Sequence, residues 1–325
     1  MNNHGVEKRP KVSVCVTAYN HERYIRQCLQ SIVDQEADFD FEVVVGDDCS
    51  TDGTRAIIEE FADKYPAMVR TIFQEKNMGG TKNYFDVHGA ALGEYIAHVD
   101  GDDYCLPGKL RRQVEILDTN PNIAVACHFV KVEGDEAQDV YRTSHLPRVG
   151  NTATLVEFGS YFAHSSKMYR AAVISNPQHN DVCIDLLLHI EHSRSGGIYL
   201  DDRYYGVYRH HEMGTSKLGK YKDAIMDSLD RAYDRAIELG VDRRLVERAR
   251  YKRRCAQAMN DLVSRDYESY KKMILFPLEH LKYIRYRHAL FRVVGAVSPA
   301  MVRFILLLRM KISSGLKRAI PLFQF

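Results

Sequence analysis

Three carboxylates follow directly after a short run of β-branched and aromatic residues. The run covers residues 95–99, and Asp100, Asp102 and Asp103 come after it. Acidic side chains crowded at one strand end repel each other. A divalent cation such as Mg²⁺ relieves this repulsion, because it binds carboxylate oxygens and substrate phosphates at the same time. The motif therefore predicts either a metal site or a solvated acidic turn.

Polar residues follow the other predicted strands in the same way. Apolar runs indicate buried strands at residues 12–17, 41–46, 69–73, 95–99 and 123–132. Amphipathic helical patterns separate these runs, and the alternation predicts an α/β fold with a mostly parallel sheet between helices. Ligands bind beyond the carboxyl ends of such strands. We therefore expect a site formed by residues 17–20, 47–48, 77–83 and 100–103.

Composition and charge narrow the class of protein. The net charge of +2 gives no sign of nucleic-acid binding, and the seven cysteines include no CxxC pair. Neither a disulfide framework nor a zinc site is predicted, and a reduced cytoplasmic setting fits this cysteine usage. The first ten residues contain no apolar core, so no secretory signal is predicted.

The charge is unevenly distributed along the chain. Residues 271–325 contain 11 Lys and Arg but only one acidic residue, Glu279. From about residue 220 onward the apolar pattern is helical. We expect a catalytic domain over residues 1–218 and a helical, basic region over residues 219–325.

Four sequence blocks together carry a family resemblance. They are VSVCVTAYNHERYIRQCLQSIVDQ, FEVVVGDDCSTDGT, EYIAHVDGDDYCLPGKL and IDLLLHIEHSRSGGIYLDDRYYGVYRHH. The blocks occur in the order found in glycosyltransferase family 2, and over residues 11 to about 216 the chain resembles this family. The resemblance implies a Rossmann-like GT-A fold, a nucleotide-sugar donor, most often a UDP-sugar, and an inverting transfer that uses Mg²⁺ or Mn²⁺.

The resemblance also implies where the donor nucleotide binds. Thr17, Ala18 and Tyr19 match the start of the family's base pocket, although a packed aromatic would equally explain Tyr19. Asp48 matches an aspartate that hydrogen-bonds the base, and a carboxylate can accept the imide N–H of uracil.

A glycine-containing loop follows the third predicted strand. Asn77 and Lys82 lie in it, and Lys82 would meet a phosphate as a point charge. The family often has Arg near this position at a different spacing, and a solvated surface lysine is the simpler interpretation.

The D-x-D element comprises Asp100, Gly101 and Asp102. Asp102 matches the metal ligand, and Asp100 would contact the ribose, or the metal through water. Gly101 would permit close approach of the donor, whereas Asp103 would brace the turn or help position the acceptor.

Asp185 matches the family's catalytic base, because it precedes Gly196 at the family's spacing. It would take the proton from the acceptor hydroxyl, a form of help worth about 10²–10⁴ in rate. The family commonly has Glu-Asp here, whereas this chain has Ile184 before the aspartate. A helix N-terminal Asp would also explain the residue, and Asp181 matches the base less well.

The segment YRHH provides two further candidates. Arg209 or His211 would hold the leaving diphosphate or complete the metal shell, with Ser216 nearby in sequence. A lone histidine is more often structural than a ligand. His164, Ser165 and Ser166 resemble the family's acceptor-side loop, but core packing would also explain them.

Other functions fit the sequence less well. A sugar-phosphate nucleotidyltransferase needs a Gly-rich basic loop after its first strand, which TAYNHE does not provide. Processive synthases carry Q-x-x-R-W, and this chain has no tryptophan. A catalytically inactive nucleotide-sugar-binding or scaffold protein of glycan assembly remains the alternative to a transferase of bacterial surface polysaccharide (O-antigen, capsule or a related glycan) synthesis.

The basic C-terminal region raises the question of membrane contact. Residues 289–310 are apolar, but Arg292, Pro299 and Arg303 interrupt them. Each central Arg costs about 2.5–3.5 kcal/mol in a membrane span. Residues 271–325 are better explained by a segment lying on an anionic membrane surface, at the inner face of the plasma membrane and suited to a lipid-linked glycan acceptor. The alternative is a helical cap on the catalytic domain or on a second subunit of a homo-oligomer.

Overall fold

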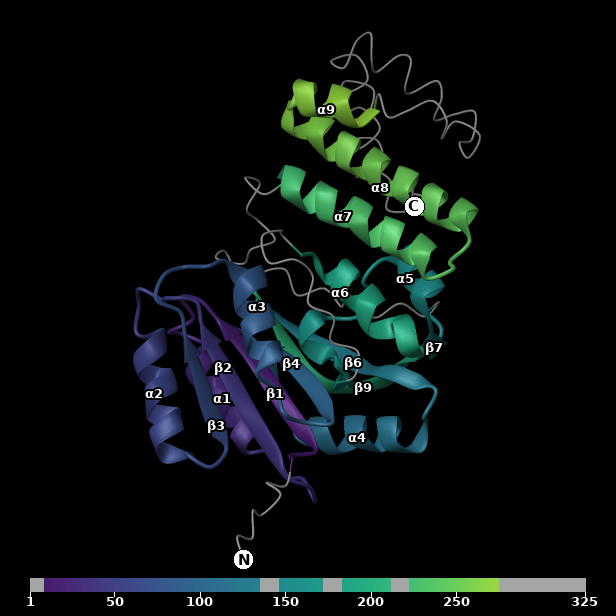
Figure 1. Ribbon diagram of the computed structural model, residues 1–325. Coiled ribbons are helices and arrows are strands. Elements are labelled where there is room, and N and C mark those ends of the chain that lie inside the picture. The colour runs from purple at the N-terminus through teal and green to yellow at the C-terminus, as the bar shows by residue number, and fades with distance from the viewer. Residues whose placement is uncertain (1–8, 135–145, 172–182, 212–221, 275–325) are drawn as a thin grey trace, which may run out of the picture. The chain divides into compact units, whose positions relative to one another are not determined.

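The computed structural model describes residues 9–134, 146–171, 183–211 and 222–274 (Figure 1). The chain divides into two compact units, residues 1–235 and 236–325. Ser216, residues 289–310 and most of the basic region therefore lie outside the described residues.

The first unit is built on one sheet of nine described strands, in the order β3-β2-β1-β4-β8-β6-β9-β5 with β7 beside β9. The strands β3, β2, β1 and β4 are parallel, whereas β8 is antiparallel to both of its neighbours. The strand bounds are β1 Val12–Ala18, β2 Phe41–Asp47, β3 Val69–Phe73, β4 Tyr95–Asp100, β5 Tyr104–Cys105, β6 Ile123–Gly134, β7 Val149–Gly150, β8 Met168–Arg170 and β9 Gly197–His210.

Helices connect and cover these strands (Figure 1). In the first unit they are α1 Ile25–Val33, α2 Thr54–Lys64, α3 Gly80–Gly89, α4 Lys109–Thr119, α5 Thr152–Phe158, α6 Asp185–His192 and the short 3₁₀ turns η1 His164–Ser166 and η3 Ser193–Ser195. Helix α7 (Lys222–Glu238) spans the boundary, and α8 (Arg243–Ser264) and α9 (Tyr267–Ile274) belong to the second unit.

The alternation of side chains along the central strands separates two faces of the sheet. On β4, Tyr95, Ala97 and Val99 belong to the main apolar core together with residues of α1, α2 and α4. His98 and Asp100 therefore point to the opposite face, where α3 and α6 contribute a smaller apolar cluster. A strand that looks uniformly apolar thus delivers polar groups to one face only.

Close approach of α3 to β2 depends on a glycine. A Cβ atom at Gly46 would lie 2.2 Å from Cγ2 of Val87 and 2.5 Å from Oδ1 of Asn83. Both distances are too short for any larger side chain, so α3 can lie directly on the sheet only because residue 46 has none.

The predicted fold class is confirmed, and all five expected strands are present within two residues of their predicted ends. The structure adds the antiparallel β8 and the long β9, neither of which was expected. Across the residues that the structure describes, no helix combines the length and the apolarity that crossing a membrane requires. The boundary at residue 218 stays a prediction.

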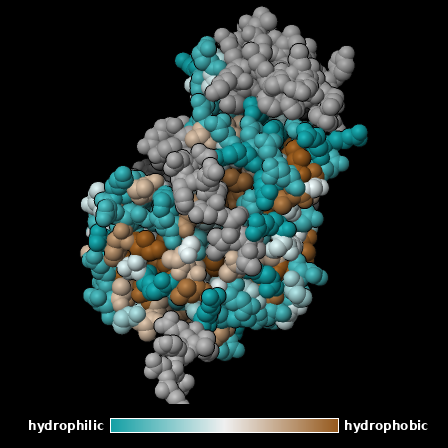
Figure 2. All heavy atoms as spheres, viewed as in Figure 1, coloured by the Kyte–Doolittle hydropathy of each residue, from teal (hydrophilic) through white to brown (hydrophobic). Residues whose placement is uncertain are grey.

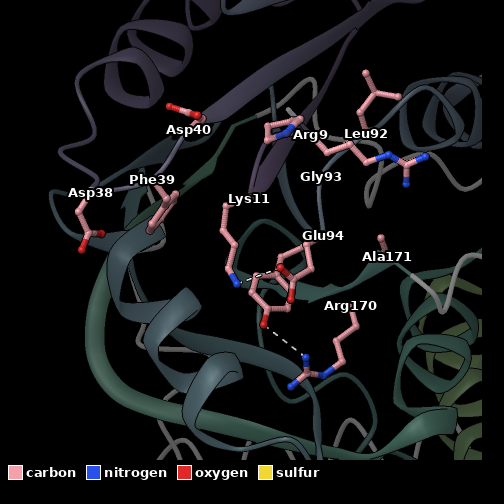
Figure 3. A pocket seen from close by; sticks show the side chains of 12 residues that line it. Arg9, Lys11, Asp38, Phe39, Asp40, Leu92, Gly93, Glu94, Arg170 and Ala171 are labelled. Carbon is pink, nitrogen blue, oxygen red and sulfur yellow. Dashed lines mark hydrogen bonds and ion pairs between the residues drawn. The ribbon is translucent and has the colours of Figure 1, made fainter. Parts of the chain in front are cut away.

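The described surface of the first unit is mixed, with apolar residues scattered among hydrophilic ones on the face shown in Figure 2. Tyr19 and Met78 are among the exposed large apolar side chains. A cavity of about 780 Å³ lies at the amino ends of β1 and β4, opposite the polar strand ends. Figure 3 shows Lys11 in this cavity, where its ammonium group pairs with Glu94 at 2.9 Å.

Candidate active site

The carboxyl ends of β1, β2 and β4 meet at one edge of the sheet. Thr17 pairs with Gly46 on one side and with Asp100 on the other. The Thr17 hydroxyl lies 3.4 Å from Oδ1 of Asp100, and Ala18 accepts a hydrogen bond from the backbone N–H of Asp48. The predicted donor-side residues of these three strands therefore do lie together.

Asp48 shapes the loop in front of α3. It is 2% exposed, and its two carboxylate oxygens accept the backbone N–H groups of Met78 at 2.6 Å and Gly79 at 2.8 Å. Desolvation raises the pKa of Asp48, although these two hydrogen bonds oppose the rise. Tyr19 is 43% exposed at the end of β1, so it is not a packed core aromatic.

The other two predicted residues of this loop are less engaged with the site. Asn77 is exposed, and the ammonium group of Lys82 pairs with Asp86 one turn along α3. A phosphate contact by Lys82 would require that pair to open.

The three carboxylates at the end of β4 have three different environments. Asp103 is 1% exposed and accepts hydrogen bonds from the Ser165 hydroxyl at 2.5 Å and from the backbone N–H of Arg209 at 2.9 Å. Desolvation raises the pKa of Asp103 well above its ordinary value, and the charges of Asp102 and Asp100 raise it further. Asp103 therefore braces the turn against β9 and η1.

Asp100 is turned toward the α3 and α6 face. Its carboxylate lies 3.1 Å from Nε2 of His98 and accepts the Ser165 hydroxyl at 3.0 Å. Desolvation acts to raise the pKa of Asp100, but His98, Ser165 and Lys167 outweigh it, and the pKa lies below its ordinary value. Asp100 is thus held in its ionised form.

Asp102 contacts His211, the residue that follows β9. Its Oδ2 lies 2.9 Å from Nε2 of His211 and 3.9 Å from Nε2 of His21. The ring of Tyr24 stacks on His211 with centroids 4.8 Å apart. A Cβ atom at Gly101 would lie 2.8 Å from Nδ1 of His21, so glycine lets the histidine approach.

Arg209, near the end of β9, also contacts Asp102. Its guanidinium group donates to the backbone carbonyl of Asp102 at 2.7 Å and lies over the rings of Tyr24 and Tyr104. Cation–π contacts of this kind help to hold a planar cation in place.

The donor atoms around Asp102 fit a hard divalent cation. Carboxylate oxygen and imidazole nitrogen both bind Mn²⁺ or Mg²⁺, and Nδ1 of His211 is buried without a hydrogen-bond partner among the described residues. Within the described ranges, however, no group of three or more His, Cys, Asp or Glu could hold a metal ion. Asp100 points away, so a cation at Asp102 and His211 would need further oxygens from a diphosphate and water.

Asp185 begins α6 on the other side of the cluster. Its side chain is 58% exposed, and Oδ1 lies 3.4 Å from Nδ1 of His164. Partial desolvation of the carboxylate raises its pKa to about 6, whereas Lys167 opposes the rise. The start of α6 is held by the Ser228 hydroxyl, which accepts the backbone N–H of Ile184 at 3.0 Å.

The predicted acceptor-side loop is largely structural. Ser165 bonds Asp100 and Asp103, and Ser166 is fully buried with its hydroxyl donating to the carbonyl of Ala163. His164 alone of the three predicted residues contacts Asp185.

Sequence reasoning missed several residues of this site: His21, Tyr24, His98 and Lys167. One signal was available for His98, because a histidine inside an otherwise apolar buried strand must find a polar partner. The other three are brought in by loops and by the short strand β8.

Comparison with known proteins identifies the family of the chain. The sequence model of Glycosyl transferase family 2 matches residues 13–176. The uncharacterised protein Rv1520 of Mycobacterium tuberculosis is 35% identical over 212 residues, which are 62% of this chain and 60% of that protein. The chain thus spans less than two thirds of this relative.

Staphylococcus aureus TarS, a poly(ribitol-phosphate) beta-N-acetylglucosaminyltransferase, is similar in sequence and in structure. It is 31% identical over 174 residues, 53% of this chain and 29% of that protein. The crystal structure of TarS 1-349 in complex with UDP-GlcNAc superposes with a TM-score of 0.67 at 20% identity, over 90% of this chain and 89% of that one. This likeness supports the GT-A fold, and the match over residues 13–176 shows that the chain belongs to glycosyl transferase family 2.

Proposed function

We propose that this protein is an inverting glycosyltransferase that moves a sugar from a nucleoside-diphosphate sugar to a hydroxyl group of a glycan acceptor. The observation that carries the proposal is the division of the acidic residues. Asp102 lies with Arg209 and His211 at the strand ends, whereas Asp185 stands apart from them, open to solvent at the start of α6.

The donor would bind along the ends of β1, β2 and β4. Tyr19, after the end of β1, and Met78, next to the buried carboxylate of Asp48, are both exposed and would offer apolar surface to a base. A uracil imide N–H would then donate to a remaining lone pair of Asp48. The solved relative TarS was crystallised with UDP-GlcNAc, which makes a UDP-sugar the first donor to test.

The diphosphate would lie against Arg209 and the pair formed by Asp102 and His211. Pre-placed positive charge stabilises negative charge as it develops on a leaving group. A Mg²⁺ or Mn²⁺ ion held by Asp102 and His211 would supply further positive charge there. A mannosyltransferase of Pyrobaculum calidifontis, with a TM-score of 0.52 at 16% identity, was crystallised with GDP-Man and Mn²⁺.

Asp185 would accept the proton of the acceptor hydroxyl. In one step the acceptor oxygen forms a bond to the anomeric carbon, the bond from that carbon to the diphosphate breaks, and the hydroxyl proton passes to Asp185. Attack from the side opposite the leaving group inverts the anomeric configuration. A pKa of about 6 leaves the carboxylate ionised yet basic near neutral pH.

The acceptor would belong to a bacterial surface polysaccharide. The relatives include the Bacillus subtilis putative teichuronic acid biosynthesis glycosyltransferase TuaG, 34% identical over 109 residues. A lipid-linked glycan would suit the basic residues 271–325, which we propose contact an anionic membrane surface.

A panel of nucleotide sugars, each with and without Mn²⁺ or Mg²⁺, tests the proposal. We expect one donor, most simply a UDP-sugar, to raise the melting temperature and to be slowly hydrolysed. Stabilisation without any turnover, unaffected by replacement of Asp185, would instead favour an inactive nucleotide-sugar-binding protein.

A further inference from the structure

A lysine is buried behind the proposed catalytic base. Lys167, between η1 and β8, has no exposed side-chain surface. Its Nζ lies 2.8 and 2.9 Å from the two ring nitrogens of His164 and 5.2 Å from the centroid of the Tyr84 ring. None of the ion pairs between described residues includes Lys167. An ammonium group buried in this way is costly, whereas methionine would fill similar space without a charge.

Burial and two nearby carboxylates have opposite effects on the pKa of Lys167. Desolvation lowers its pKa to about 7, and the charges of Asp185 and Asp100 raise it in opposition. The interaction also affects Asp185. Among the charged neighbours of this carboxylate, Lys167 lowers its pKa the most. The ammonium group therefore lies within the electrostatic reach of both acidic residues.

His164 lies between the two charges. Nδ1 of His164 is 3.4 Å from Asp185 and 3.3 Å from Nε2 of His189. Desolvation, followed by the charge of Lys167, lowers the pKa of His164 well below its ordinary value. The imidazole is therefore neutral, and it spaces the ammonium group from the carboxylate without adding a competing charge.

We propose that Lys167 is a positioning residue for the transfer reaction: its buried ammonium group, held against His164, keeps the carboxylate of Asp185 ionised and ready to accept a proton. The inference rests on the proposed function of Asp185 as the base. Lys167 itself touches no substrate, because it is fully buried.

Other titratable groups also act on this carboxylate and must be separated from Lys167. Asp100 on β4 raises the pKa of Asp185. Tyr208 on β9 and Cys183 before α6 are coupled to Asp185 by charge. His189 on α6 and His98 on β4 are buried, and desolvation lowers the pKa of each. Among the described residues, Lys167 is the cation that lowers the pKa of Asp185, so Lys167 is the group to vary.

The first experiment measures the protonation of Asp185 without relying on turnover. In protein with ¹³C-carboxyl-labelled aspartate, Asp185→Asn assigns the resonance and Lys167→Met tests the effect. We expect the pKa of Asp185 to rise by about one unit in Lys167→Met, the lower end for loss of a nearby opposite charge. An unchanged pKa would overturn the inference.

The pH profile of kcat/KM gives a second measure. A rise of one unit from about 6 would lower kcat/KM of Lys167→Met about fivefold at pH 6 and less than about twofold at pH 8. A merely structural residue would lower activity equally at both pH values, so a uniform loss would contradict the proposal.

A second buried lysine provides the matched control. Lys109 is 1% exposed and donates to the backbone carbonyl of Ser165 at 2.6 Å. Lys109→Met also removes a buried charge, and we expect it to leave the pKa of Asp185 unchanged. A shift as large as that in Lys167→Met would mean that any buried charge suffices.

If Lys167→Met does not fold, the reciprocal measurement decides, because coupling between two sites is mutual. Asp185 is exposed at the start of α6, so Asp185→Asn should fold. The pKa of Lys167, followed by its ¹³Cε resonance, should then fall below about 7, and no change would overturn the inference. Full transfer activity in Asp185→Asn would instead defeat the proposed function, whereas an inactive Asp185→Asn with no shift in Lys167 defeats only this inference.

Discussion

At the scale of residues, chemical type does not determine function in this site, because neighbouring carboxylates lie in different surroundings. Asp103 is buried under hydrogen bonds that fix a turn, whereas Asp102 faces two histidines. Asp185 is more than half exposed, and its pKa is raised to about 6. A base needs access to its substrate and a pKa near the working pH, and Asp185 meets both conditions.

Replacing Asp185 with asparagine would remove the proposed proton acceptor and preserve the shape of the side chain. We expect kcat to fall by about 10²–10⁴ while the affinity for the donor stays unchanged, because the base acts only in the transition state. Steady-state kinetics and calorimetry with UDP measure the two quantities. A matching loss of donor affinity would mean that Asp185 binds the donor instead.

Replacement of His211 tests the proposed metal site independently of the transfer reaction. We expect His211→Ala to weaken Mn²⁺ binding in the presence of UDP by at least about tenfold, because one of two protein donors is lost. Electron paramagnetic resonance of free Mn²⁺ measures this affinity. His210→Ala, at the last residue of β9, is the control and should keep the Mn²⁺ affinity of the unmodified protein. If His211→Ala also kept that affinity, His211 would be excluded as a ligand.

At the scale of elements, β9 is the part of the first unit that completes the site. It runs from Gly197 to His210 beside β6 and brings Arg209 and His211 back to the acidic turn that follows β4. At its centre Asp201 is 1% exposed and pairs with Arg112 of α4 at 2.7 Å and Arg203 at 3.0 Å. The pair with Arg112 holds the strand against the helix, whereas Arg203 lies on the same strand as Asp201.

Stability should depend on Asp201 in a pH range set by its pKa. Burial acts to raise this pKa, but Arg203 and Arg112 outweigh it and hold the value at about 2, against about 3.9 in an unfolded chain. A lowered pKa stabilises the fold above about pH 4, and the stabilisation is lost as the pH falls toward 2. We expect Asp201→Asn to reduce the free energy of unfolding at pH 7 by about 2 kcal/mol.

Urea denaturation at pH 7 and at pH 3 measures this difference, which should shrink at the lower pH. Asp202→Asn is the matched control, since Asp202 is the exposed neighbour on the same strand. Equal destabilisation by both variants would contradict the stabilising role assigned to the ion pairs of Asp201.

At the scale of the whole molecule, charge is unevenly distributed along the chain. The first unit contains the acidic cluster and the family match, whereas 11 basic residues and one acidic residue lie in residues 271–325. Basic residues near an anionic membrane contribute about 1 kcal/mol each. The membrane contact that we propose for residues 271–325 would hold the enzyme where a lipid-linked acceptor is found.

Flotation with vesicles tests this division. We expect the full chain to float with vesicles that contain anionic lipid, and less so as salt is raised, because salt screens surface charge. A chain that ends at Ile274, the last residue of α9, should remain at the bottom of the gradient. Equal flotation of both chains would show that residues 275–325 do not bind the membrane.

The sequence by itself determined the α/β class and the position of the parallel strands. A strand buried on both faces must be apolar along its length, so residues 12–18 and 41–47 are recognisable locally. The ends of these strands were predictable because the apolar run stops there. Asp48, Asp102 and Asp185 were chosen by the family resemblance, and their functions remain predictions.

Only the tertiary structure decided which groups surround these carboxylates. The three-residue strand β8 pairs antiparallel with β4 across more than 70 positions of sequence, and a pairing this short leaves no periodic signal. It places Lys167 and His164 behind Asp185 and sets Ser165 between Asp100 and Asp103. A pKa depends on charges and water around a group in space, so no local pattern could have predicted that Lys167 and His164 surround Asp185.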